Sequence, residues 1–211
     1  MTSPARGLVA ASMAALIAGA SCASAPPRVK LTEDWPASVA DYGDVTSSWT
    51  RSAVLHGEYQ EILSLAAIFK SPEWRAAHAA KDADALDLEG TARQARFSQA
   101  QADAQGPYEI ELLVTTWDRR ENDLDRGKRS VWKVFLVDDH GAEIAPLEIV
   151  KDKRPTFVLR AEFPALDDFA NAYIARFPRD KEHPVLGPGT HSVKLRMWSE
   201  RGGVEVAWLA P

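Results

Sequence analysis

The stretch YEIELLVTTW, residues 108–117, indicates most directly which fold class the chain adopts. Its apolar side chains recur at every second position, at Tyr108, Ile110, Leu112 and Val114. Glu109 and Glu111 fill the positions between them. Because successive side chains of a β-strand point to opposite faces, this alternation predicts a strand with one buried face. The same pattern places the two glutamates on the face that we expect to be exposed to solvent.

Similar alternating runs follow this strand to the end of the sequence. They occupy residues 130–141, 143–150, 156–163, 171–177 and 191–209. The last run predicts a hairpin around Gly202 and Gly203, and Pro146 indicates an edge strand or a bulge in the second run. Turn-forming residues recur roughly every 8–12 residues, the spacing expected of a sandwich or a barrel. The sequence shows no alternation of strands with helices, which argues against a parallel sheet.

The segment before this region is expected to form another hairpin. Residues 47–69 contain two apolar halves around Gly57, which is a suitable residue for the turn. The second half also fits a period of 3.6 residues, so a helix remains an alternative there. Residues 35–45 contain Pro36 and Gly43 and are expected to form an irregular lead-in.

A helical insertion is expected between the two strand-forming regions, at about residues 71–105. Ser71 is placed to cap the helix, and Pro72 occupies its first position. Alanine, glutamine, arginine and leucine, which have high helix propensity, dominate the segment. Gly90 is expected to break or bend the helix.

The length and composition favour one soluble domain around one core. The chain has 211 residues, of which 45% are hydrophobic and 26% are charged, as in ordinary globular proteins. We therefore predict a mainly β fold, a single antiparallel β-sandwich over residues 36–211 with the helical insertion. An immunoglobulin-like arrangement is the favoured form of it, and an open curved sheet is the alternative.

The N-terminal segment is typical of an export signal. Arg6 precedes the apolar run GLVAASMAALIAGAS, residues 7–21, and small residues follow it. The only cysteine of the chain, Cys22, comes directly after AGAS, residues 18–21. This arrangement resembles the lipobox of bacterial lipoproteins, although Gly19 stands where that motif usually has leucine.

The lipobox resemblance implies a processing pathway and a location. Residues 1–21 would be the signal peptide, the Cys22 thiol would receive diacylglycerol, and its new amino group would be acylated with a fatty acid such as palmitate. Residues 22–35 would form a flexible tether. Ala23 after the cysteine favours the outer membrane, on its periplasmic or its surface side. The membrane and an envelope protein are thus the predicted partners.

Two other interpretations of this segment stay open. Signal peptidase could cut after Ala25, at the end of an A-x-A sequence that Pro26 follows. The uncharged residues 7–27 could instead remain as a membrane anchor. A lone thiol forms no internal disulfide, so Cys22 is interpreted as a lipidation site under the favoured interpretation.

The net charge argues against nucleic acid as a partner. The chain carries 25 basic and 30 acidic residues and a formal charge of −5. Arg6 is the one charged residue of the predicted signal peptide, so its removal leaves 24 basic and 30 acidic residues. A protein of this charge lacks the basic surface that binding to phosphates requires.

The loop WDRRENDLDRGKRS, residues 117–130, has the densest mixture of charges. Its acidic residues are Asp118, Glu121, Asp123 and Asp125. The spacing fails the EF-hand pattern because Gly127 comes one residue early and Val134 stands where glutamate would be needed. We interpret the segment as a solvated loop held by local salt bridges, and its four acids as a candidate recognition site for a polar partner.

The remaining motifs predict no catalysis. VDDHG, residues 137–141, is typical of a β-turn, which we prefer to a site built from Asp138 and His140. No nucleophile motif, phosphate loop or dinucleotide motif is found in the sequence. Four tryptophans in strand-forming runs are expected to pack in the core or between strands, with a carbohydrate-stacking face as the alternative: Trp117, Trp132, Trp198 and Trp208.

The sequence thus predicts an envelope-anchored lipoprotein with a non-catalytic binding or structural β domain. It predicts no catalytic residue, no metal and no cofactor. One alternative is an envelope hydrolase that uses acidic loop residues such as Asp123 or Asp138. Another is a subunit of a secretion or surface assembly that joins its partners through an exposed strand edge.

Overall fold

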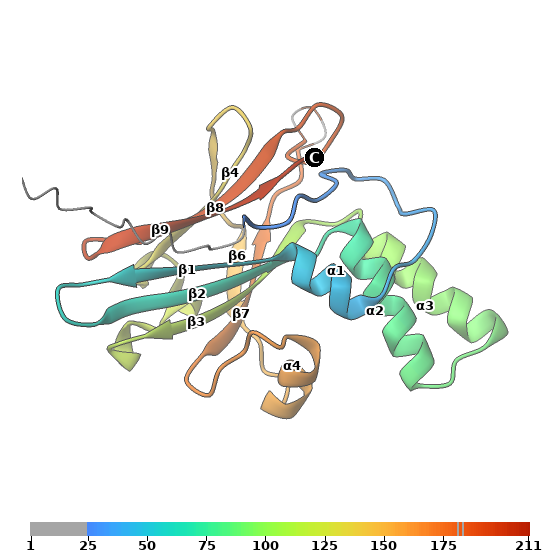
Figure 1. Cartoon of the computed structure of the whole chain (residues 1–211), viewed down its shortest axis with the longest axis horizontal. Helices are drawn as coiled ribbons and strands as arrows, with labels where there is room; N and C mark the ends of the chain where they lie inside the picture. Colours follow the sequence, from blue (N-terminus) through green and yellow to red (C-terminus); the bar gives the residue numbers. More distant parts are fainter. Residues whose placement is uncertain (1–24, 181, 183) are drawn as a thin grey trace, which may run out of the picture.

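A computed structural model describes residues 25–180, 182 and 184–211 of the chain. Cys22 and the predicted signal peptide lie outside the described residues. Within this part of the chain, nine strands form two antiparallel sheets (Figure 1). The predicted β-rich class is therefore confirmed.

The five-stranded sheet has the order β1–β2–β3–β7–β6, and the four-stranded sheet has the order β5–β4–β8–β9. The first consists of β1 (Thr50–His56), β2 (Glu61–Phe69), β3 (Tyr108–Thr116), β7 (Asn171–Phe177) and β6 (Glu148–Lys151). The second consists of β5 (Glu143–Ile144), β4 (Lys133–Val137), β8 (Ser192–Ser199) and β9 (Gly202–Leu209). The helices are α1 (Tyr42–Trp49), α2 (Pro72–Ala85), α3 (Gly90–Asp103) and α4 (Thr156–Glu162), with the short 3₁₀ turns η1 (Arg119–Glu121) and η2 (Leu124–Arg129).

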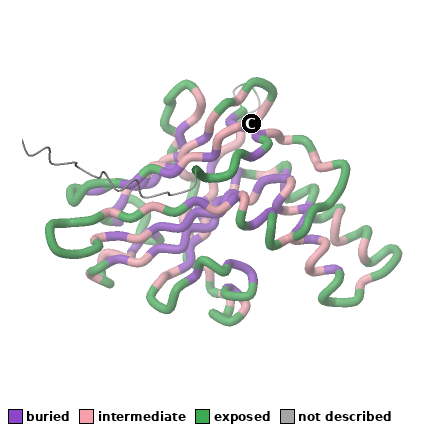
Figure 2. The backbone as a smooth tube through the Cα atoms, in the orientation of Figure 1, coloured by how far each residue is buried: buried purple, intermediate pink, exposed green. Residues whose placement is uncertain are grey.

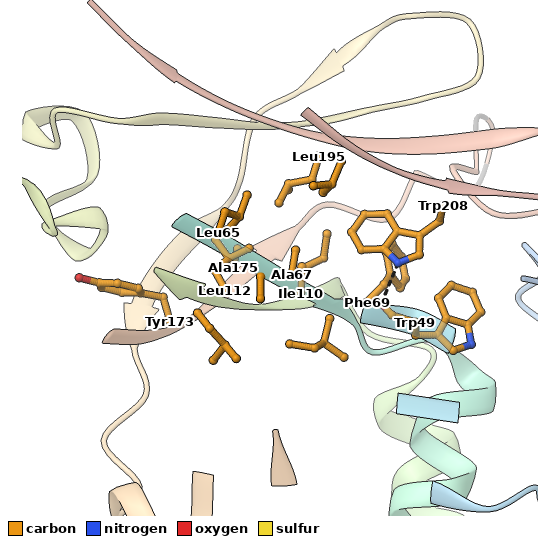
Figure 3. Close-up of a cluster of buried hydrophobic side chains, with 14 of the residues drawn as sticks. Trp49, Leu65, Ala67, Phe69, Ile110, Leu112, Tyr173, Ala175, Leu195 and Trp208 are labelled. Atoms are coloured by element: carbon orange, nitrogen blue, oxygen red, sulfur yellow. Dashed lines mark hydrogen bonds between the residues drawn. The ribbon is translucent and has the colours of Figure 1, made fainter. Parts of the chain in front are cut away.

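One hydrophobic core connects the inner faces of the two sheets (Figure 3). The five-stranded sheet contributes Leu65, Ala67, Ile110, Leu112, Tyr173 and Ala175, and the other sheet contributes Leu195 and Trp208. The Trp208 indole donates a hydrogen bond of 2.8 Å to the carbonyl of Trp49. Each leucine or isoleucine buried in this way stabilises the fold by roughly 1.5–3 kcal/mol.

Arg51 links the edge strands of the two sheets. Its side chain is buried in β1, and its Nε donates to the Ala207 carbonyl of β9 at 2.8 Å. Nη1 donates to the Ser48 carbonyl, and Nη2 donates to the carbonyl of Pro27. The guanidinium thus satisfies backbone carbonyls that would otherwise be left without donors between the two sheet edges.

The chain joins the domain within the segment expected to be a tether. The Val29 amide donates to the Leu209 carbonyl at 2.9 Å, and the side chains of Val29 and Leu31 are buried.

The helical insertion is present as two helices. The Ser71 hydroxyl accepts the Trp74 amide and caps α2, and Pro72 is its first residue, as the sequence predicts. The helix ends before residues 86–89, and Gly90 begins α3 at a φ of +51°. Figure 2 shows α3 mostly exposed, and Ala100 is its one buried residue. Figure 1 shows α1, α2 and α3 together at one end of the five-stranded sheet.

Two predicted elements are wrong, because short helices form in their place. A strand was expected at residues 156–163, but residues 156–162 form α4, and Phe157 is 75% exposed. The Leu159 amide donates to the Pro155 carbonyl, so the proline begins a helical turn. Residues 42–49 form α1, where the end of the irregular lead-in and the start of the first hairpin were expected. The helix begins there because the Asp41 carboxylate accepts the amides of Gly43 and Asp44.

The predicted hairpins hold, with shifts in their turns. The Gly57 amide donates to the Gln60 carbonyl at 2.7 Å and closes the β1–β2 turn. The C-terminal hairpin turns at residues 200–201, and Gly202 already pairs with Ser199. Residues 143–150 form two strands in different sheets, so Pro146 lies in a crossover between the sheets.

Candidate functional site

The outer face of the five-stranded sheet contains the two most unusual groups of side chains. In the β2–β3–β7 register, Ile68 lies opposite Glu111 and Glu111 lies opposite Ile174, and all three point away from the inner core. Ser64 and Thr115 lie on the same face, nearer the other end of these strands. We call the end around Glu111 the covered half and the end around Ser64 and Thr115 the open half.

The covered half lies beneath side chains from α2 and α4. The rings of Trp74 and Phe163 stack with their centroids 6.1 Å apart. The ammonium group of Lys70, directly after β2, lies 5.9 Å from the Trp74 ring and 5.8 Å from the Phe163 ring. Two aromatic rings therefore shield a lysine from water on the outer face of the sheet.

Glu111 is completely buried in the covered half, with 0% of its side chain exposed. The Lys70 Nζ lies 2.8 Å from its Oε2 as an ion pair, at an angle that leaves both carboxylate oxygens without a well-formed hydrogen bond. Burial raises the pKa of Glu111 to about 7, although the charge of Lys70 opposes this shift. The predicted solvent exposure of Glu111 is wrong, because strand alternation does not reveal which helices cover a sheet face.

A chain of ion pairs surrounds the Glu111–Lys70 pair. Arg154 binds Asp152 at 2.7 Å and also binds Glu162. The other oxygen of Glu162 lies 3.0 Å from Nε2 of His78, whose Nδ1 lies 3.4 Å from Asp82. Burial alone would raise the pKa of Glu162, but the hydrogen bond and charge of His78, with the charge of Arg154, lower it. The ion pairs fasten α4 to α2, and we assign the cluster a structural role.

The open half contains a cleft of about 570 Å³ on the same sheet face. Small side chains form its floor, at Ser64, Thr115 and Ala170. Trp117 and Phe169 line it with side chains that are 69% and 67% exposed. A hollow arises here because the floor side chains are short, and in the described part of the chain no α-helix contributes a residue to its lining.

The walls of the cleft are held by backbone and side-chain hydrogen bonds. The Trp117 amide donates to the Ile62 carbonyl at 3.0 Å, so the β2–β3 ladder extends to the tryptophan. The Asp167 carboxylate accepts the Thr115 hydroxyl at 3.0 Å and the amides of Phe169 and Ala170 at 2.7 Å. These contacts fix the backbone on both sides of the exposed aromatic rings.

Three of the four acids of the predicted recognition loop bind a nearby side chain or backbone amide. Asp118 caps η1 and binds Arg120, and Glu121 binds Arg201. Asp123 is buried and accepts the Ser130 hydroxyl at 2.9 Å and the Val131 amide at 3.1 Å. Asp125 is exposed on η2. The loop passes from one sheet to the other, and recognition by these acids stays a prediction.

The residues of VDDHG form a turn. The Asp138 carboxylate accepts the amides of His140 and Ala142, and Gly141 has a φ of +85°. Asp139 accepts the His191 amide at 3.1 Å and the Ser192 amide at 3.0 Å, which ties the turn to the start of β8. Across the described ranges, no group of three or more His, Cys, Asp or Glu residues is arranged to hold a metal ion.

The cleft was not predicted as a site from the sequence. Trp132 and Trp208 are buried, as expected of tryptophans in strands, but Trp117 and Trp198 are 69% and 45% exposed. Phe169 lies between strands, and no motif marks it. The one sequence pattern that could have indicated the cleft is the alternation of the strand, which places Trp117 on the same sheet face as Thr115.

Comparisons with known proteins give no relative for this chain. Of the helices in the described ranges, none has the length and apolar character needed to cross a membrane. Neither the known protein families, nor the curated proteins, nor the solved structures contain a significant match to the sequence or the fold.

Proposed function

We propose that the chain is an exported, lipid-anchored protein of the bacterial cell envelope that binds a ligand without catalysis. Its two sheets serve as a β-sandwich scaffold, and the cleft of the open half is the binding site. The observation that carries this proposal is the exposure of Trp117 and Phe169 beside a hollow of about 570 Å³. Ligand-binding clefts in proteins have volumes of about 300–1,000 Å³ and contain aromatic side chains with a few polar groups.

Rigidity of the cleft supports a binding role. Ser64 and Thr115 lie on paired strands in the interior of the five-stranded sheet, and Asp167 holds the loop that carries Phe169. Residues fixed in this way lose little conformational freedom when a ligand binds, which favours affinity. Two exposed aromatic rings gain hydrophobic stabilisation only when something covers them.

The sequence supports the anchor. Cys22 follows an apolar run and small residues in the order of a lipobox, and the chain contains no other cysteine. Two or more acyl chains on one residue hold a protein stably at a membrane, whereas one chain holds it only marginally. A domain attached from Val29 onward would then present its cleft close to the membrane that carries it.

The anchor is tested by metabolic labelling in the native host with radioactive palmitate. The wild type is expected to incorporate label and to sediment with membranes, and Cys22→Ala is expected to do neither. Equal labelling of both proteins, or no labelling of either, would contradict the anchor.

Binding in the cleft is tested with Ser64→Leu, which fills the floor. Ser52→Leu is the matched control, because Ser52 is exposed on the same sheet face but lies outside the cleft. Soluble saccharides, stem peptides and fatty acids of the envelope are screened by nuclear magnetic resonance against each protein. A compound that binds the wild type and Ser52→Leu but not Ser64→Leu is expected, and binding that survives in Ser64→Leu would place the site elsewhere.

A further inference from the structure

We infer that the ligand of the open-half cleft is a saccharide, a step that rests on the binding function proposed above. The cleft combines exposed aromatic rings with uncommitted polar side chains on a flat sheet face. A pyranose ring needs this combination, because it has an apolar face of C–H bonds and a rim of hydroxyl groups.

The position of the cleft excludes strand addition as the mode of binding. Its floor lies on β2, β3 and β7, whose backbone groups pair with one another, as Leu63 does with Thr116 and Val114 with Asn171. An extended peptide binds to an open sheet edge through backbone hydrogen bonds, and this face offers none. Recognition in the cleft must therefore come from side chains.

The lining supplies both apolar and polar contacts. The rings of Trp117 and Phe169 are large, exposed and rigid, with only two rotatable bonds each. Among the described residues, the Ser64 hydroxyl and the Glu61 carboxylate form no hydrogen bond with another side chain. These two groups can pair with the hydroxyls of a sugar that lies against the rings.

Charge and polarity argue against the other envelope ligands. Among the described residues, Arg119 is the one cation that lines the cleft, and it lies over the Phe169 ring, while Glu61 and Asp168 are acidic; this lining does not attract a polyanion. An acyl chain would cover the Ser64 hydroxyl and the Glu61 carboxylate without giving them a hydrogen-bond partner, which is unfavourable. A neutral polyhydroxylated ligand has neither disadvantage.

The inference is tested by calorimetry on the full-length protein in detergent. The probes are chitotetraose, cellotetraose, maltotetraose and the disaccharides that muramidase releases from peptidoglycan, with a stem peptide and decanoate as comparison arms. At least one saccharide is expected to bind, and Trp117→Ala is expected to weaken it roughly tenfold, as truncation of an interface tryptophan commonly does. Trp198→Ala is the matched control, because Trp198 is also exposed but lies on the four-stranded sheet.

Each outcome decides the inference. Tenfold weaker binding in Trp117→Ala with unchanged binding in Trp198→Ala supports it. Saccharide binding that both variants retain in full would overturn it, because the site would lie outside the cleft. Binding of the stem peptide or decanoate alone, abolished by Ser64→Leu, would overturn the inference of a saccharide ligand. It would leave the proposed binding function intact. No binding of any probe would overturn both.

Discussion

The two halves of the outer face of the five-stranded sheet are made by the same strands and differ in what lies over them. At the covered half, Glu111 is completely buried and pairs with Lys70 beneath two aromatic rings. At the open half, Ser64 and Thr115 form the floor of a cleft. The difference teaches that one alternating strand can carry a buried charge at one end and, on the function proposed above, a binding surface at the other. Substitutions in the covered half should therefore change stability, and substitutions in the open half should change binding.

The largest expected loss of stability follows the change Lys70→Met. It leaves Glu111 buried without its cation, and breaking a buried ion pair in this way costs about 3–5 kcal/mol. We expect the lower end of this range, because a glutamate with a raised pKa escapes part of the cost by taking up a proton. Urea denaturation at pH 7 measures the change.

A double variant provides the control for this loss. Lys70→Met with Glu111→Leu replaces the ion pair by two apolar side chains, and we expect its stability to return to within about 1 kcal/mol of the wild type. A double variant no more stable than Lys70→Met would show that Glu111 has a role beyond its pairing with Lys70.

The second expected effect is a pH dependence that comes from Glu111. Its pKa is raised from 4.5 to about 7 in the folded protein, so folding favours the protonated form. Its contribution to stability is then fully present below pH 4.5 and is lost as the pH rises through 7. A pKa difference of this size corresponds to about 3 kcal/mol.

The comparison with Glu111→Gln isolates this contribution. Glu109, Asp152 and Glu162 have lowered pKa values, and their contributions are lost as the pH falls, but they are present in both proteins. Between pH 4.5 and pH 8, wild-type stability should fall relative to that of the Gln variant. Parallel pH profiles of the two proteins in urea denaturation would contradict the raised pKa.

The sequence predicted most strands because their alternation is local. Residues 108–116 and 171–177 are strands, and Pro72 begins a helix that Ser71 caps. The strand predicted at residues 156–162 is wrong. A proline before the segment and good helix formers in its second half favoured a helix over the alternating pattern. The predicted exposure of Glu111 is also wrong, because its burial depends on where α2 and α4 pack. No local sequence pattern indicates that packing.

The candidate site was less accessible from the sequence than the fold. Trp117 continues the alternation of β3, so its face could be predicted, but its exposure depends on the absence of a covering helix. Phe169 reaches the cleft through a turn that Asp167 holds, and a turn of this kind has no signature beyond its aspartate. The composition of the charged loop predicted a recognition site, yet three of its four acids bind side chains of the protein itself.

The third expected effect concerns Asp167, at the edge of the cleft, and is measured on both stability and binding. Asp167→Ala removes the acceptor of the Thr115 hydroxyl and of two backbone amides, at Phe169 and Ala170. Because the carboxylate is exposed, we expect a loss of only about 1 kcal/mol in stability. On the function proposed above, a saccharide should nevertheless bind more weakly, since Phe169 loses its fixed position. Asp138→Ala is the control, because that carboxylate also accepts two backbone amides but lies outside the cleft. An equal effect of both changes on affinity would contradict the role of the Asp167 turn.

The smallest expected effect on stability is that of Trp117→Ala. A side chain that is 69% exposed contributes little to the core, so the free energy of unfolding should stay within about 0.5 kcal/mol of the wild type. Exposing a tryptophan ring to water is unfavourable, and this ring contributes little to folding. We therefore expect a ligand to cover it. If Trp117→Ala instead lowers stability by as much as Lys70→Met, the ring packs against the protein, and the open half is structural in the same way as the covered half.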